Sequence, residues 1–167
     1  MLFLKVNMIN KISEDVFQLI FKKFGSCVYI LKLKEGIFLI DLSTKENKNE
    51  FIKDLKSLGI KNSDVKGILL THKHFDHIGN IDLFKNTKVL TKKEIEKLGI
   101  KVFKTPGHTK DSVCFLYKKI LFSGDTLFHN GIGRTDLPSG NKEEMKKSLD
   151  FLKKLNYEIL CPGHVNI

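Results

Sequence analysis

The amino-acid sequence predicts an α/β fold in which two β-sheets carry helices on both outer faces. Short apolar runs rich in Val, Ile and Phe occupy the first quarter of the chain, and segments of helical period follow them. Strand-like runs then alternate with helical segments to the end of the chain, a pattern typical of this layered arrangement. The length of 167 residues predicts one domain, 1–167, with room for a substantial core.

The first 42 residues are predicted to form strands separated by polar or glycine-containing turns. The expected strands are residues 2–6, 15–21, 27–33 and 36–42. The opening residues 1–10 are apolar, but the run is short and lacks a small-residue cleavage site, so we expect a strand there and not a signal peptide.

The apolar period changes after residue 44, because Phe51, Leu55 and Leu58 recur at helical spacing and Gly59 is a plausible stop. In the last expected helix, Asn141 and Glu144 stand where a capping box would place them. The expected helices are residues 45–59, 91–99 and 141–155. The expected later strands are residues 65–71, 87–90, 100–105, 112–118, 119–125 and 157–164, with a hairpin turn at Lys118–Lys119.

The composition restricts the classes of partner. No apolar run approaches the ~20 residues of a membrane helix, so we expect no membrane partner. The net charge of +10 raises nucleic acid as a partner, yet 28 of the 29 basic residues are dispersed lysines and only Arg134 is an arginine. This favours a solvated surface over a phosphate-binding one, with RNA binding or processing left as the lesser alternative. No exposed apolar stripe indicates an interface between copies.

The cysteines Cys27, Cys114 and Cys161 are widely separated and odd in number. They form no CxxC pair and no disulfide framework, which favours a reducing cytoplasm and buried apolar thiols.

Five of the six histidines fall at the carboxyl ends of expected strands, where open α/β sheets place ligands. Two residues apart in an extended segment, His72 and His74 point to the same side and can bind one ion. A turn after Phe75 would carry Asp76 and His77 to a neighbouring position, about 3.5–4 Å away in a two-metal site. Imidazole with carboxylate suits zinc, iron or manganese.

The stretches "THKHFDH", "PGHT", "FSGDTLF" and "PGH" stand in an order that resembles the metallo-β-lactamase superfamily over essentially the whole chain. The resemblance implies an αββα sandwich of two mixed sheets, with a dinuclear site along one edge. It implies that His72, His74 and His108 bind the first metal, that Asp76, His77 and His164 bind the second, and that Asp125 bridges both. Two divalent ions are implied, with zinc favoured and iron or manganese as alternatives.

The segment "GDTLFHNGIGRTDLPSGN" is similar to glyoxalase II-like thioester hydrolases and to the related persulfide dioxygenases. The bridging Asp125 disfavours β-lactam hydrolysis. Glyoxalase II also has a C-terminal helical region that holds glutathione, and a sequence that stops at Ile167 leaves glutathione recognition open.

The function that we predict is hydrolysis of a small-molecule thioester or related ester by metal-bound hydroxide, with Asp76 as the catalytic carboxylate that orients or deprotonates it. A thiolate leaving group, with a pKa near about 8.5, needs no dedicated acid. The alternative is a persulfide dioxygenase, in which a single iron takes His72, His108 and Asp125. An RNA-processing nuclease is the third possibility.

Arg134 stands alone among lysines, which indicates a need for its guanidinium. We expect it to pair with Asp136 or a loop carbonyl and so support the loop 131–140; direct substrate contact is the alternative. His129 fits no ligand position and is expected on the surface or in a loop.

Overall fold

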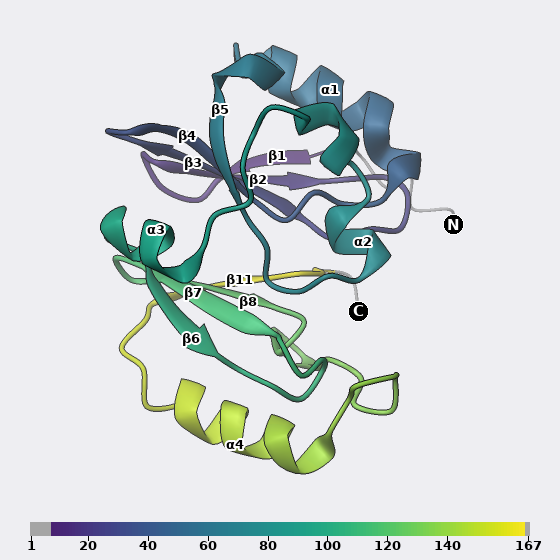
Figure 1. Ribbon diagram of the computed structural model, residues 1–167, viewed down its shortest axis with the longest axis vertical. Coiled ribbons are helices and arrows are strands. Elements are labelled where there is room, and N and C mark those ends of the chain that lie inside the picture. The colour runs from purple at the N-terminus through teal and green to yellow at the C-terminus, as the bar shows by residue number, and fades with distance from the viewer. Residues whose placement is uncertain (1–7, 166–167) are drawn as a thin grey trace. The chain divides into compact units, whose positions relative to one another are not determined.

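The computed structural model describes residues 8–165 and is shown in Figure 1. The first expected strand, residues 2–6, lies outside the described residues. The chain divides into two compact units at Leu90–Thr91, and each unit has a sheet of its own. The single domain expected from the length stays a prediction. Across residues 8–165, no helix has the length and apolarity needed to cross a membrane.

The sheet of the first unit has five strands in the order β1-β2-β3-β4-β5. Their bounds are β1 Met8–Lys11, β2 Val16–Ile20, β3 Val28–Leu33, β4 Gly36–Ile40 and β5 Val65–Leu69. The pairs from β1 to β4 are antiparallel, whereas β4 and β5 are parallel, so this sheet is mixed. A parallel pair needs a long crossover. Here the crossover holds the 3-10 helix η1 (Lys45–Asn47), the helix α1 (Lys48–Ser57) and the 3-10 helix η2 (Asn62–Asp64).

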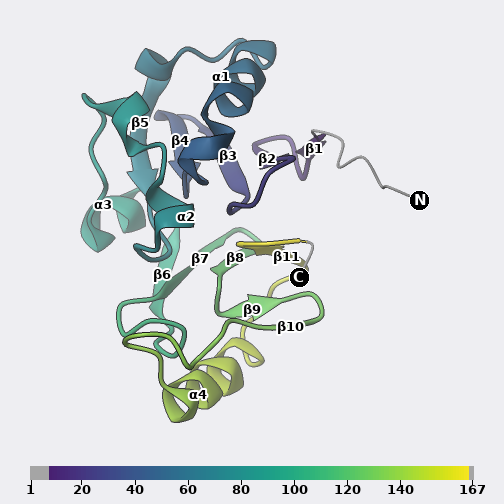
Figure 2. The ribbon, with the colours of Figure 1, turned by 90° about the vertical axis from the view of Figure 1, so that its right-hand side faces the viewer.

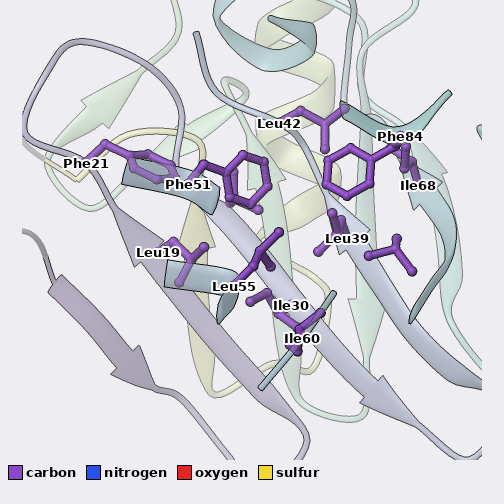
Figure 3. Close-up of a cluster of buried hydrophobic side chains, with 12 residues drawn as sticks. Leu19, Phe21, Ile30, Leu39, Leu42, Phe51, Leu55, Ile60, Ile68 and Phe84 are labelled. Carbon is purple, nitrogen blue, oxygen red and sulfur yellow. The ribbon is translucent and has the colours of Figure 1, made fainter. Parts of the chain in front are cut away.

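Helix α1 covers one face of this sheet. The predicted helical positions Phe51 and Leu55 are buried among Leu19, Ile30 and Leu39 of three different strands (Figure 3). Burial of such side chains is worth about 1.5–3 kcal/mol each, so the apolar face of α1 holds the helix in place.

Two short segments of the first unit differ from expectation. Residues 87–90 were expected to form a strand, and that expectation is wrong: only Val89 forms an isolated parallel bridge, to Ile68. The pairing stops there because only Lys88 O and Leu90 N bond to the backbone of Ile68. The helix α2 (Phe75–Ile78) and the 3-10 helix η3 (Ile81–Phe84) were not expected, since each spans about one turn and shows no apolar period.

The second unit has a four-stranded sheet in the order β11-β8-β7-β6. Its elements are α3 (Lys92–Lys97), β6 (Lys101–Lys104), β7 (Val113–Tyr117), β8 (Ile120–Gly124), β9 (Leu127–Phe128), β10 (Gly131–Ile132), α4 (Lys142–Leu152) and β11 (Ile159–Pro162). This sheet is also mixed, because β11 joins β8 in parallel while β6, β7 and β8 are antiparallel (Figure 2). The predicted hairpin turn is confirmed, with Lys118 at a φ of 53° between Tyr117 and Ile120.

Helix α4 packs on its sheet through Leu152, which is buried with Cys114, Leu116 and Leu121. Its predicted cap is confirmed on one side, because Asn141 Oδ1 accepts a hydrogen bond of 2.9 Å from the backbone N–H of Glu144. The helix therefore begins where the sequence predicts and ends three residues earlier than expected.

Candidate metal centre

Within residues 8–165, seven histidine and aspartate side chains are candidate metal ligands, and they are the seven that the family resemblance implies. The first unit supplies His72, His74, Asp76 and His77, and the second unit supplies His108, Asp125 and His164. Each group follows the carboxyl end of a strand: β5 in the first unit, and β6, β8 and β11 in the second.

In the first unit, the chain leaves β5 extended, so His72 and His74 lie on the same side. Nε2 of His72 is 3.0 Å from Nδ1 of His74. Two nitrogen donors at about 2.0–2.1 Å from a tetrahedral ion are roughly 3.3 Å apart. The spacing of these two ring nitrogens therefore suits a shared ion. This distance confirms the prediction that two histidines spaced two residues apart place their imidazoles on the same side.

In the turn that follows, the imidazole of His77 lies against a buried carboxylate, that of Asp41. Nδ1 of His77 is 2.8 Å from Oδ2 of Asp41, and both side chains are buried. An Nδ1–H that donates to this carboxylate leaves Nε2 as the nitrogen that can bind a metal. Oδ2 of Asp76 lies 3.8 Å from that Nε2, so the two predicted ligands of the second metal are adjacent.

Sequence reasoning missed Asp41. Its carboxylate also accepts hydrogen bonds from Thr71, 2.9 Å from the backbone N–H and 2.7 Å from Oγ1. Its φ of 57° is a left-handed conformation that costs on the order of 1–3 kcal/mol in a residue other than glycine. The available signal was a carboxylate directly after the apolar run of β4, the same pattern that drew attention to Asp125.

In the second unit, a single carboxylate oxygen faces two imidazoles. Oδ2 of Asp125 is 3.6 Å from Nε2 of His108 and 3.5 Å from Nε2 of His164. All three side chains are buried. The parallel pairing of β8 with β11 brings Asp125 and His164 together, because both residues follow neighbouring strand ends. An oxygen that faces two nitrogen donors is compatible with a carboxylate shared by two metal ions.

Arg134 acts on this cluster through its backbone. Its carbonyl oxygen is 2.7 Å from Nδ1 of His108, which orients Nε2 of that ring toward Asp125. The guanidinium pairs with Asp136 through two hydrogen bonds, 3.0 Å from Nε and 2.9 Å from Nη2. This pair lowers the pKa of Asp136, chiefly through the hydrogen bond from the guanidinium. The predicted pairing with Asp136 is confirmed.

Gly133 lies against both Asp125 and His108, and its lack of a side chain allows this close approach. A Cβ at this position would collide with the carbonyl oxygen of Asp125 and would lie 3.0 Å from Nδ1 of His108. Only glycine lets the loop approach both predicted ligands at once.

The three cysteines are buried, and none is in a disulfide. This confirms the expectation of buried thiols. Burial raises the pKa of the Cys114 thiol to about 11, against an opposing effect of hydrogen bonds with Thr105 and Thr126. None of the three is among the candidate ligands within residues 8–165.

The donor set fits a transition-metal centre. Its members are imidazoles and carboxylates, the ligands that zinc, iron and manganese share. Three rings have their Nδ1 atoms near hydrogen-bond partners: His72 at 3.1 Å from Thr71 Oγ1, His77 at Asp41 and His108 at Arg134 O. Such fixing of the ring is characteristic of metal-binding histidines.

Comparison with known proteins identifies the family. The model of the Metallo-beta-lactamase superfamily matches residues 22–101 and 88–164. A protein described as a probable metallo-hydrolase of Methanocaldococcus jannaschii is 28% identical over 187 aligned residues, which cover 86% of this chain and 89% of the relative. A hydroxyacylglutathione hydrolase of Buchnera aphidicola is 37% identical and matches 66% of this chain. The chain spans 52% of that enzyme's length.

The fold agrees with a solved structure, TTHA1623 in a di-iron-bound form. The TM-score is 0.70 at 26% sequence identity, with 83% of this chain and 87% of that chain covered. The α/β architecture with mixed sheets and helices is therefore the one the sequence predicts, and the chain belongs to the metallo-β-lactamase superfamily.

Proposed function

We propose that this protein is a dinuclear metal-dependent hydrolase that acts on a thioester or a related ester. The observation that carries the proposal is Asp125, whose Oδ2 faces Nε2 of both His108 and His164. A carboxylate so placed suits two ions better than one. The similarity to hydroxyacylglutathione hydrolases supports the choice of a thioester.

The proposed ligand assignment follows the family pattern. His72, His74 and His108 would hold one ion, Asp76, His77 and His164 the other, and Asp125 both. Zinc is the metal we propose, with iron as the alternative that the di-iron form of TTHA1623 favours. When bound, the two ions would lower the pKa of a shared water toward about 7 and would polarise the substrate carbonyl.

The remaining roles belong to the chain itself. Buried Asp76 would orient the attacking water and accept its proton. Asp41 keeps the Nε2 of His77 available, and the carbonyl of Arg134 does the same for His108. The leaving thiolate, with an ordinary pKa near about 8.5, would depart without a proton donor.

Metal analysis and a thioesterase assay on the same preparation test this proposal. Two ions per chain together with thioester hydrolysis would support it. The double variant His72→Ala/His74→Ala should lose at least about a hundredfold in kcat/KM, since it removes two ligands of one ion. His129→Ala is the matched control, because this exposed histidine is not among the candidate ligands of the described chain. One iron per chain with oxygen uptake on a persulfide would instead assign the dioxygenase activity.

A further inference from the structure

Two exposed phenylalanines of the first unit lie next to each other although the chain separates them widely. Phe24 is 62% exposed and Phe75 is 69% exposed, more than any other large hydrophobic side chain among residues 8–165. Their ring centroids are 6.4 Å apart, with the planes tilted by 41°. Exposed apolar side chains that adjoin one another, unlike single ones, are characteristic of surfaces that contact a ligand or partner.

The loop that carries Phe24 is held firmly by its backbone. The carbonyl oxygen of Phe24 accepts hydrogen bonds from Thr44 Oγ1 at 2.7 Å and from Asn47 Nδ2 at 3.0 Å. The next residue, Gly25, has a φ of 153°, and a Cβ there would collide with Ser43 Oγ. Phe24 is therefore presented by a preorganised loop, so little further ordering would be needed for it to contact a ligand.

The same loop is tied to the turn of the predicted metal ligands. The backbone N–H of Ser26 donates to the carbonyl oxygen of Asp76 at 3.0 Å. Phe75 is the first residue of helix α2 and stands directly between His74 and Asp76. Phe75 is thus next in sequence to two side chains that we assign to the ions, and Phe24 lies beside Phe75.

We propose that Phe24 and Phe75 determine substrate specificity by contacting an apolar acyl group of the thioester. This inference rests on the proposed function and names its substrate class. Both the acyl chain and the sulfur adjoin the scissile carbonyl, so the choice between them rests on polarity. Two exposed phenyl rings complement an alkyl or aryl chain, whereas a thiol carrier such as glutathione is polar and charged, and we therefore assign the rings to the acyl group. The favoured substrate is accordingly a thioester with a medium-length alkyl or an aryl acyl group.

The test compares two series of thioesters on the metal-loaded protein. In the first series, the acyl group grows from acetyl to octanoyl on N-acetylcysteamine; in the second, acetyl is kept and the thiol grows from ethanethiol to octanethiol. We expect kcat/KM to rise with acyl length in the parent. The octanoyl-to-acetyl ratio should fall about tenfold in Phe24→Ala and in Phe75→Ala, because each removes one apolar contact surface.

Conservative and matched variants separate specificity from folding. Phe24→Leu and Phe75→Leu should keep most of the ratio, because leucine is also apolar. Phe151→Ala is the control, because this ring is 39% exposed on α4, its centroid is 5.2 Å from that of Phe103, and it is not next to any candidate ligand in the sequence. Its ratio should equal that of the parent. Equal losses on acetyl and octanoyl substrates in the alanine variants, or dependence on the thiol length alone, would overturn the inference.

A binding measurement keeps this inference separate from the proposed function. A ketone analogue of the octanoyl thioester, with methylene in place of sulfur, cannot be hydrolysed at that bond. Tighter calorimetric binding of this ketone than of its acetyl counterpart, lost in the Phe24→Ala/Phe75→Ala double variant, supports the aromatic contact even where no thioester is cleaved. Equal binding of both ketones by the parent refutes it even where hydrolysis is fast.

Discussion

The carboxylate of Asp41 and the imidazole of His77 form a buried pair, with 2.8 Å between Oδ2 and Nδ1. The pair joins the end of β4 to the turn after β5, and it sets which nitrogen of His77 can bind a metal. An uncharged amide in the same place would keep the volume and weaken the hold on the Nδ1 proton.

We therefore expect Asp41→Asn to lower metal affinity by about 10–100-fold. Competition with a chromogenic chelator measures this directly, without an activity assay. Asp82→Asn is the matched control, since Asp82 pairs with Lys48 on the surface at 3.3 Å. Unchanged affinity in Asp41→Asn would remove Asp41 from the support of the metal centre.

Arg134 and Asp136 should behave as one unit in a double-mutant cycle. If the guanidinium only supports the loop, Arg134→Ala, Asp136→Ala and the double variant lose similar amounts of kcat/KM, because each breaks the same pair. The carbonyl that orients His108 belongs to the backbone and survives all three changes. A much larger loss in Arg134→Ala than in Asp136→Ala would instead assign direct substrate contact to the guanidinium.

Gly133→Ala should be strongly destabilising, because the added Cβ would collide with the carbonyl oxygen of Asp125. We expect a loss of about 1–3 kcal/mol in the free energy of unfolding, measured by urea denaturation. Gly131→Ala provides a control two residues away, where an added Cβ meets nothing within 4 Å. Equal stability of the two variants would contradict this packing.

The buried Cys114 thiol should make the free energy of unfolding decrease at alkaline pH, and a variant without the thiol can show this. Its pKa rises from an ordinary 9.0 to about 11 on folding, because burial disfavours the thiolate. The associated stability is present below pH 9 and is lost as the pH rises from 9 to 11. Two pH units correspond to roughly 3 kcal/mol.

Relative to Cys114→Ala, the parent should therefore lose roughly 3 kcal/mol of unfolding free energy over this interval. Urea denaturation of both proteins at several alkaline pH values makes the comparison. Parallel stability curves would show that Cys114 ionises equally in the folded and unfolded states.

Much of the architecture was predictable because long apolar runs carry a clear period. Phe51 and Leu55 fell in the core of the first unit for that reason. The four candidate ligands of the first unit were predictable because the short spacing of His72, His74, Asp76 and His77 is chemically specific, whereas His108, Asp125 and His164 rested on the family resemblance. Helix α2 was missed because a single turn shows no apolar period. Residues 87–90 resembled a strand because of their apolar side chains, but a strand also needs a paired neighbour, and only Val89 has one.

The supporting residues lay beyond sequence reasoning for a different reason. Asp41 reaches His77 only through the pairing of β4 with β5, and no spacing along the chain encodes that pairing. Phe24 likewise meets Phe75 through folding alone. Long-range contacts of this kind depend on topology, whereas the motif of His72, His74, Asp76 and His77 lies within six consecutive residues.

The parallel pairing of β11 with β8 also orders events during synthesis of the chain. Asp125 and His108 leave the ribosome well before β11, the strand that precedes His164. A nascent chain that ends before Ile159 contains both strands of the β7–β8 hairpin. It lacks β11 and therefore lacks His164, the second imidazole beside Asp125. The three-residue cluster of the second unit can therefore assemble only after β11 has been synthesised, which is after the other strands of its sheet.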